Sequence, residues 1–496
     1  MLSGGYVVSM EESIGELPRG DVLIEDGVIV RVAAEVEVGD CERVDVTGHV
    51  VMPGFVDTHR HTWQTPFRGV CADWTLEEYF RGMRMAISPA CAAHDVYAGN
   101  YLGALEALEA GVTTILDFSH CNNSPEHADA ALQGLRDAGI RAMFAYGYYP
   151  APSPEPAFTE HAQRLRDARR IRERELSSDD ALVTMGLALT ELGLLPFEQT
   201  IAEARSAREL AVPSVLHTGC NWGSLVTEGL PELDHHGLLF EEQVHVHCNT
   251  LDERNLRRLA EHGCKVSSSP ETEIQMGMGH PVISRALACG MRPSLSCDVM
   301  SSNSGDMFTQ MRIGLQFERC MRNDTFHARN VMPDTLELTV RDALRWATAN
   351  GAHAMGLERR VGSLAPGKQA DVIVVGGRRL NMVPMADPVG CMVAQANPSN
   401  VRHVLVAGRF AKRDGELVGV NLDSAIELVR DSSERVLARV RAAQLHAGAA
   451  DTRQQPPRAQ SPARALLAPV PDGFAELVNA AAAQNLARAW SIQPGG

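Results

Sequence analysis

The stretch that decides the fold occupies residues 51–64 and has the sequence VMPGFVDTHRHTWQ. The apolar residues before Pro53 predict the end of one strand, and Pro53-Gly54 predicts a turn. The apolar pair after the turn predicts a second short strand that ends near His59. Side chains two positions apart on a strand share a face, so the imidazoles of His59 and His61 are expected to project to the same side. Two neutral imidazoles aimed at one point favour a divalent metal.

Length and composition narrow the class of protein. A chain of 496 residues accommodates one large barrel and a smaller partner domain. Its 46 basic and 62 acidic residues give a net charge of −16, which argues against a nucleic acid or an acidic membrane as partner. The sequence contains no run of 18 apolar residues, and its first residues lack the features of a signal peptide. We therefore expect a cytoplasmic protein without a membrane partner.

The middle of the chain alternates between strand and helix patterns. After the strand that ends near His59, buried strands are predicted at residues 112–117, 141–146, 182–188, 214–217, 244–247, 264–269 and 293–298. Helical patterns fill most of the gaps, over Leu102–Glu109, His127–Ala138, Glu198–Leu210 and Leu251–Glu261. Eight such strand–helix units predict an α/β fold, a (β/α)8 TIM barrel over residues 51–359.

The two ends of the chain predict a second domain. Residues 1–50 and 360–423 carry short strands separated by turns, and neither piece is large enough to stand alone. We expect them to form one small composite β-sandwich. Residues 424–445 predict a helix, and residues 446–496 predict a linker followed by a terminal helix.

Metal-ligating residue types stand at the ends of four predicted barrel strands. His59 and His61 end strand one, His217 ends strand five, His247 ends strand six and Asp298 ends strand eight. In a TIM barrel all of these ends surround one mouth. His59, His61, His217 and Asp298 are expected to hold one Zn²⁺ or Fe²⁺ and to leave a position for water. Asp298 is expected to take the proton of that water, and His247 to polarise the substrate.

This set of residues predicts metal-assisted hydrolysis at an electrophilic carbon, with an amine, an amide nitrogen or a halide as leaving group. A second metal in such a barrel usually needs a carbamylated lysine from strand four. The chain has only Lys265, Lys368 and Lys412, and none lies near the end of that strand. The eleven cysteines form no C-x-x-C pair, so a cysteine-based zinc site is not supported. One divalent metal is predicted.

Several motifs in the same order carry a resemblance to a known family. They are Met52 to His61 with Gln64 and Arg68-Gly69, then Gly111 to Thr114, Ser296 to Asp298 with Ser302-Asn303, Asp306 to Phe308, and Gly362 to Val372. The chain resembles the amidohydrolase superfamily over residues 1–425, in the branch of cytosine/guanine/adenosine-type deaminases and chlorohydrolase-like triazine hydrolases. The resemblance implies the metal ligands named above, a substrate-side role for His247 and Gln64, and a homodimer or higher homo-oligomer.

Two positions depart from the pattern of that family. Family deaminases usually carry a proton-shuttling glutamate three residues after the strand-five histidine, where this chain has Cys220. Relatives also have Ser-Asn after the strand-seven proline, where this chain has Glu271 and Glu273 nearby. One of these two glutamates is expected to replace the missing shuttle or to bind an amino-bearing edge of the substrate. Trp63, near the mouth, is expected to stack on a planar heterocycle.

The sequence therefore predicts a metal-dependent aminohydrolase that releases ammonia, or a substituted amine, from a small N-heterocyclic substrate. Hydrolysis of a ring amide or a carbon–halogen bond is the alternative within enzymes, because a good leaving group needs less help from a protonating side chain. A metal-binding barrel without catalysis is the alternative from another class.

Overall fold

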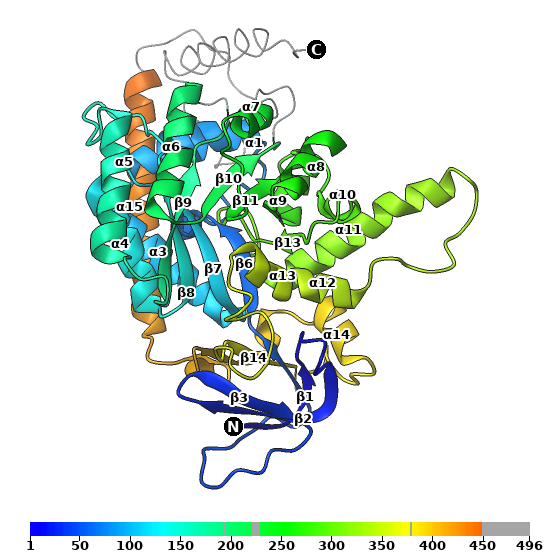
Figure 1. Cartoon of the computed structure of the whole chain (residues 1–496). Helices are drawn as coiled ribbons and strands as arrows, with labels where there is room; N and C mark the ends of the chain where they lie inside the picture. The colour runs from blue at the N-terminus through cyan, green and yellow to red at the C-terminus, as the bar shows by residue number, and fades with distance from the viewer. Residues whose placement is uncertain (193–194, 221–228, 377–378, 449–496) are drawn as a thin grey trace.

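The computed structural model describes residues 1–192, 195–220, 229–376 and 379–448. Eight parallel strands form the predicted barrel, and each pairs with the next one in the sequence (Figure 1). They are β6 (Phe55–Arg60), β7 (Val112–Ser119), β8 (Arg141–Gly147), β9 (Val183–Leu189), β10 (Ser214–Thr218), β11 (Gln243–His247), β12 (Lys265–Ser268) and β13 (Ser294–Leu295). The TIM barrel predicted from the alternating patterns is confirmed. Only β13 is clearly shorter than expected, because residues 296–298 continue as irregular chain.

Helices cover the outside of the barrel between the strands (Figure 1). The α-helices of this layer are α3 (Ala93–Glu109), α4 (Pro125–Ala138), α5 (His161–Arg170), α6 (Phe197–Leu210), α7 (Gly229–His235), α8 (Glu253–Glu261), α9 (Pro270–Gln275), α10 (Ile283–Ala288), α11 (Met307–His327), α12 (Val340–Trp346) and α13 (Ala349–Ala354). Four of them, α3, α4, α6 and α8, overlap the predicted helical segments. After β6 the chain forms the 3-10 helix η1 (Thr62–Phe67), then α1 (Leu76–Tyr79), the π-helix η2 (Phe80–Ile87) and α2 (Ser88–Ala90).

The barrel is filled by apolar side chains from its strands. Every residue of β7 and β8 is buried, which explains why these strands appear in the sequence as nearly continuous apolar runs. Inside the barrel, one apolar cluster includes Val56, Leu116, Phe118, Met143, Ala145, Ala188, Val215, Val244 and Val246. A closed and filled barrel leaves its functional groups to the rim.

The barrel closes where β6 meets the segment that follows β13. The backbone N–H of Asp298 donates to the carbonyl of His59 at 2.9 Å, and the N–H of His61 donates to the carbonyl of Asp298 at 3.0 Å. Asp57 Oδ1 also accepts a hydrogen bond from the backbone N–H of Cys297 at 3.0 Å. The same contacts that close the barrel therefore place Asp298 beside the two imidazoles.

A buried arginine supports this closure from behind. The guanidinium of Arg60 donates to Asp57 Oδ2 at 3.1 Å, to Glu106 Oε2 at 3.1 Å and to the carbonyl of Gly305 at 3.2 Å. The side chains of Arg60 and Asp57 are fully buried. A buried charge with several partners fixes the local geometry but is costly to leave unpaired.

The predicted second domain is confirmed as a second sheet built from both chain ends. Its order is β17-β16-β15-β14-β5-β1-β2-β3, with β4 paired to β1. The strands are β1 (Leu2–Val8), β2 (Glu16–Glu25), β3 (Val28–Ala33), β4 (Val44–Asp45), β5 (His49–Pro53), β14 (Val372–Gly376), β15 (Val401–Val406), β16 (Arg409–Arg413) and β17 (Glu416–Leu417). A bridge between Val28 and Gln369 brings β3 back toward β14, so the sheet folds around one apolar core.

Gly54 alone separates β5 of the second sheet from β6 of the barrel. A Cβ atom at this position would lie 2.2 Å from Thr113 Oγ1 on β7, so only glycine fits. The domain boundary predicted at residue 51 falls inside β5, and the strand as a whole pairs with β1 and β14. The small domain is thus joined directly to β6, the strand that carries His59 and leads to His61.

Beyond the second sheet, α14 (Pro388–Ala394) and η5 (Pro398–Asn400) precede β15, and η3 (Ile171–Glu175) extends α5. The predicted helix over 424–445 lies within α15 (Leu422–Gly448), which packs along α3. Buried Asp95 on α3 accepts hydrogen bonds from Ser432 Oγ at 2.8 Å and from Arg435 at 3.0 Å. The linker was predicted to begin at residue 446, but α15 continues through Gly448. The rest of the predicted linker and the terminal helix, residues 449–496, lie outside the described residues.

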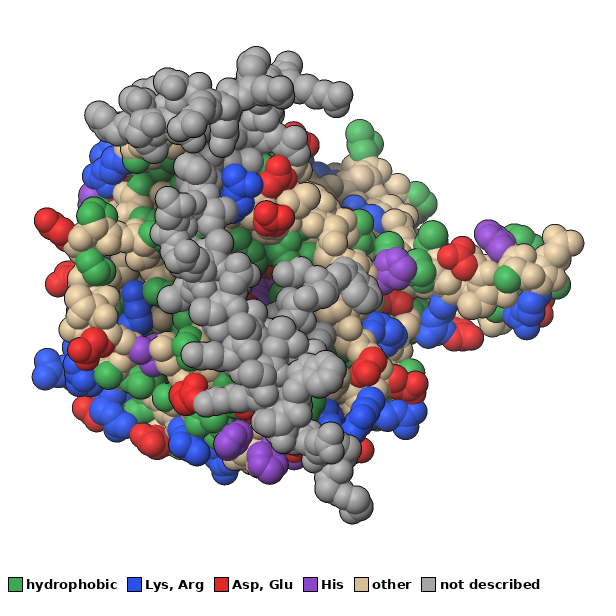
Figure 2. All heavy atoms as spheres, turned by 90° about the horizontal axis from the view of Figure 1, so that it is seen from above, with side chains coloured by type: hydrophobic (Ala, Val, Ile, Leu, Met, Phe, Trp, Pro, Cys, Tyr) green, Lys and Arg blue, Asp and Glu red, His purple; other side chains and the backbone are tan. Residues whose placement is uncertain are grey.

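The exterior shows charges of both signs. Viewed from above, acidic and basic side chains are interspersed, and α11 extends away from the body (Figure 2). None of the helices in the described ranges combines the length and apolar character that crossing a membrane requires.

We expect Arg60→Gln to lower the free energy of unfolding by about 3–5 kcal/mol, because it leaves the carboxylate of Asp57 buried without its charge partner. Arg68→Gln is the matched control. Arg68 also pairs with Glu106, at 2.7 Å, but its side chain is 42% exposed. The control should therefore cost about 1 kcal/mol or less. Urea unfolding followed by circular dichroism measures both, and equal losses would contradict the role given to Arg60.

Candidate metal centre

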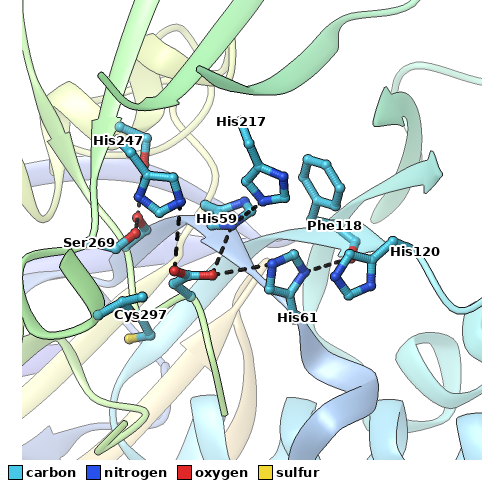
Figure 3. A network of polar contacts seen from close by, with 12 residues as sticks. His59, His61, Phe118, His120, His217, His247, Ser269 and Cys297 are labelled. Carbon is cyan, nitrogen blue, oxygen red and sulfur yellow. Dashed lines mark hydrogen bonds and ion pairs between the residues drawn. The ribbon is translucent and has the colours of Figure 1, made fainter. Parts of the chain in front are cut away.

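The four predicted metal ligands converge at the mouth of the barrel (Figure 3). Asp298 Oδ1 lies 3.0 Å from His59 Nε2 and 3.2 Å from His61 Nε2, and His217 Nε2 lies 3.2 Å from His59 Nε2. All four side chains are buried. The donor atoms of His59, His61 and Asp298, and likewise those of His59, His217 and His247, lie within 4.8 Å of one another. Residues separated by more than 200 positions thus meet at one point.

Second partners of two imidazoles determine which nitrogen faces the centre. His61 Nδ1 lies 3.1 Å from the carbonyl of Phe118, which only accepts, so Nδ1 carries the proton. His217 Nδ1 lies 2.7 Å from Glu191 Oε1 and donates to it. The Nε2 lone pairs of both rings are therefore directed at the centre, the arrangement typical of metal-ligating histidines.

This arrangement fits a cation better than a proton network. The Nε2 lone pair of His61 faces the carboxylate oxygen of Asp298 at 3.2 Å, so two acceptors oppose each other. Burial lowers the pKa of His59 to about 4 and that of His61 well below its usual value, which keeps both imidazoles neutral. Three neutral imidazoles and one carboxylate form a common ligand set for Zn²⁺ or Fe²⁺, and the residues present therefore fit a divalent metal.

His247 stands on the other side of Asp298. Its Nε2 lies 3.8 Å from Asp298 Oδ2, and its Nδ1 donates to Glu273 Oε1 at 3.3 Å. Burial alone would lower the pKa of His247, but the hydrogen bond to Glu273 and the charge of Asp298 raise it. His247 and Asp298 both adopt left-handed backbone conformations, with φ of 75° and 61°. Such strain in non-glycine residues is concentrated at functional sites.

A cavity opens beside these residues. Its apolar wall includes Leu76, Phe80, Met276, Met278 and Val299. Its polar wall includes His61, Tyr79, Arg84, His120, Glu191, His217, Cys220, His247, Thr272 and Asp298. A cavity that combines an apolar wall with convergent polar groups is typical of a small-molecule site.

Two of the three residues predicted to bind substrate, Trp63 and Gln64, lie behind this cavity, whereas the third, His247, lines it. Trp63 is buried, and its Nε1 donates to His120 Nδ1 at 2.8 Å. Gln64 is also buried, and its Nε2 donates to the Tyr79 hydroxyl at 2.6 Å. His120 and Tyr79 line the cavity, whereas Trp63 and Gln64 orient them from the second layer. Direct stacking of Trp63 on a substrate has no support in this arrangement.

The two predicted shuttle glutamates have different surroundings. Glu271 is held by Ser304 Oγ at 3.0 Å and by Gln310 Nε2 at 2.7 Å, away from the cavity lining. Glu273 lies beneath His247, and its oxygens accept hydrogen bonds from the Ser269 N–H at 2.7 Å and from Ser268 Oγ at 2.9 Å. Glu273 thus contacts a site residue and not the cavity, a position suited to orienting His247.

The cavity lining includes residues that were not predicted from the sequence, among them His120, Glu191 and Arg84. His120 follows β7, and its ring stacks on that of His61 at 4.0 Å. Glu191 follows β9 and holds His217, while Arg84 on η2 donates to the His120 carbonyl at 2.8 Å. The rule that polar residues at strand ends surround the mouth would have found His120 and Glu191. No sequence signal marked Arg84.

Cys220 lies at the cavity, where family deaminases usually carry the shuttle glutamate. Burial raises the pKa of its thiol far above neutrality, so the group stays protonated and uncharged. A neutral thiol does not replace a carboxylate in proton transfer.

A TIM barrel with imidazole and carboxylate ligands at the carboxyl ends of strands one, five and eight defines a metal-dependent hydrolase. Residues 50–411 match the sequence profile of the Amidohydrolase family, and the chain belongs to this family. The family predicted from the sequence motifs is therefore confirmed.

Curated relatives of this chain are deaminases. It is 29% identical over 449 residues to the 5-methylthioadenosine/S-adenosylhomocysteine deaminase of Syntrophobacter fumaroxidans, which covers 87% of this chain and 96% of the relative. It is 29% identical to the 5'-deoxyadenosine deaminase of Methanothermobacter thermautotrophicus, covering 81% and 91% of the two chains. The reaction class predicted from the sequence, deamination of a heterocycle, is confirmed. The protein is a metal-dependent hydrolase that deaminates a heterocycle at a carbon–nitrogen bond.

Solved structures share the fold. A zinc-bound adenosine deaminase from Xanthomonas campestris has a TM-score of 0.79 at 24% identity, covering 88% of this chain and 98% of that one. A zinc-bound atrazine chlorohydrolase from Arthrobacter aurescens TC1 has a TM-score of 0.74 at 18% identity, covering 87% and 99%. The cluster of histidines and Asp298 described above supports a divalent metal as cofactor.

A buried glutamate next to the site gives a pH-dependent prediction. Glu203 on α6 accepts hydrogen bonds from the N–H of Thr190 at 2.7 Å and from its hydroxyl at 3.0 Å. Burial raises the pKa of Glu203 from 4.5 to about 8. The unfolded chain therefore releases this proton at lower pH than the folded protein does. We expect the free energy of unfolding to fall between pH 4.5 and 8 and to level off above pH 8.

Glu203→Gln should flatten this dependence relative to the wild type, since the amide does not titrate. Chemical denaturation at several pH values measures the difference between the two proteins. Parallel pH curves would contradict the prediction.

Proposed function

We propose that the protein is a mononuclear zinc-dependent deaminase of adenosine-type nucleosides, with water as co-substrate and ammonia as product. The convergence of His59 and His61 on Asp298, with His217 Nε2 3.2 Å from His59 Nε2, is the observation that supports a single metal. The zinc-bound neighbours favour zinc over iron. The named substrates of the curated relatives, which share an adenine base, favour a purine nucleoside.

His59, His61, His217 and Asp298 would hold the metal, which supplies Lewis acidity and a hydroxide nucleophile near neutral pH. Asp298 is the group that holds the proton taken from water. Its Oδ1 faces His59 and His61, so Oδ2 is the oxygen available for that proton.

His247 is the group that polarises the substrate. Because its Nδ1–H is held by Glu273, the ring has a fixed orientation with Nε2 toward Asp298. A protonated His247 would present its Nε2–H to negative charge that develops on the heterocycle. Glu273 is therefore proposed to position His247, and not to contact the substrate.

The lining of the cavity suits a planar base. Met276, Met278 and Val299 offer apolar surface on which a heterocycle can pack. A homodimer and a cytoplasmic location remain predictions.

Hydrolysis of a carbon–halogen bond is the second candidate, and Cys220 is the observation that favours it. Chloride leaves without being protonated, so a site with a neutral thiol in place of the shuttle glutamate needs no acid for it. The two reactions differ in their products, ammonia or chloride.

The purified protein should contain about one zinc per chain, and chelation should abolish ammonia release from adenosine and its 5'-deoxy and 5'-methylthio derivatives. Asp298→Ala should lower kcat by roughly three orders of magnitude, since it removes both a ligand and the proton acceptor. Elemental analysis and an ammonia assay test both points. Absence of ammonia from all three nucleosides, with chloride released from 6-chloropurine riboside, would favour the second candidate.

Glu273→Gln should lower kcat about tenfold or more with metal retained, which is the usual cost of losing a group that orients a site histidine. Glu253→Gln, the same change at a glutamate that is 70% exposed on α8, is the control and should leave kcat unchanged. Steady-state kinetics at saturating nucleoside measures both variants. An unchanged kcat for Glu273→Gln would rule out its positioning role.

A further inference from the structure

Glu191 is a buried carboxylate at the cavity with one oxygen in use. It follows β9, the fourth barrel strand, and is only 5% exposed. Its Oε1 accepts the Nδ1–H of His217 at 2.7 Å. Its Oε2 is buried and has no hydrogen-bond partner among the described residues. A buried carboxylate oxygen that accepts no hydrogen bond is destabilising. This atom therefore requires a hydrogen-bond donor from outside the described residues.

The location of Glu191 indicates what that partner is. Glu191 lines the same cavity as His217 and Cys220, and its strand lies beside β10 in the barrel. Two carboxylates belong to the cavity lining, Glu191 and Asp298. Asp298 faces the imidazoles of the metal centre, and the oxygens of Glu273 are engaged by Ser268, Ser269 and His247. Glu191 is thus the cavity carboxylate with an oxygen left for a substrate.

We propose that Glu191 Oε2 is a substrate-binding and specificity-determining group that accepts a hydrogen bond from the amino group of the heterocycle. A carboxylate selects an N–H donor over a halogen at the same ring position, because a halogen leaves the oxygen without a donor. The end of strand four then supplies the carboxylate that the loop after strand five lacks at Cys220. This assignment rests on the proposed deamination.

The other oxygen of Glu191 gives the same residue a positioning role toward His217. The two roles are separable, because a glutamine at 191 keeps an oxygen that can accept the Nδ1–H of His217. Its amide nitrogen, in the place of Oε2, donates hydrogen bonds and does not accept them. Glu191→Gln therefore preserves the support of His217 and reverses the polarity of the atom assigned to the substrate.

The test compares adenosine with 6-chloropurine riboside, which differ at the leaving group. In wild type and Glu191→Gln, kcat/KM is measured by ammonia and chloride release, and equilibrium binding of both nucleosides is measured by calorimetry. We expect Glu191→Gln to lower kcat/KM and affinity for adenosine by roughly 10- to 100-fold, the value of a hydrogen bond to a charged group. Both quantities should change less than about threefold for the chloro compound, which never makes that bond.

Zinc content and the melting temperature of each protein accompany these measurements. Glu209→Gln is the matched control, because Glu209 lies on α6 with its side chain 63% exposed. Equal losses for both nucleosides, with or without loss of zinc, would overturn the proposal and leave Glu191 with the support of His217 alone. Unchanged values for both would also overturn it. A wild-type protein that binds adenosine but releases no ammonia would instead overturn the proposed function, since adenosine binding still reports on Glu191.

Discussion

The site depends on the closure of the barrel between its first strand and the segment after its last one. Two backbone hydrogen bonds, from Asp298 to His59 and from His61 to Asp298, join the two ends of the parallel sheet. Because β13 is only two residues long, these bonds and the buried pair of Arg60 and Asp57 substitute for a longer ladder. The hydrogen bonds that close the barrel therefore also place the carboxylate of Asp298 beside the imidazoles.

Around this closure, neighbouring groups fix the tautomer or the ring orientation of three site histidines before any ligand binds. The carbonyl of Phe118 and the carboxylate of Glu191 fix the tautomers of His61 and His217, and Glu273 fixes the ring of His247. Preorganisation of this kind lowers the cost of binding a metal and of orienting a substrate. The strained backbone at His247 and Asp298 is tolerated because both residues are held on several sides.

Much of this arrangement could be predicted from the sequence. The eight strands were predictable because buried strands of parallel sheets are nearly uniform apolar runs, and the clustering of histidines and Asp298 at the mouth followed from the residue types at the strand ends. The directions of side chains in the segments that follow the strands were not predictable. Glu271 and Glu273 are two residues apart on α9, about 200° around a helix, so one folds back under His247 and the other faces Ser304. The strand-end rule could have placed Glu191 at the mouth, but the role proposed for it follows only from its contacts.

The direct connection between the two sheets bears on how the molecule can be divided. With Gly54 as the only residue between β5 and β6, and no room there for a side chain, the junction has little freedom to act as a hinge. The small sheet supplies none of the histidines that cluster at the mouth. It is nevertheless joined directly to β6, which carries His59 and leads to His61. Excision of the terminal strands to obtain a minimal barrel would therefore release the start of β6, and the composite sheet is better regarded as a foundation of the enzyme than as a detachable module.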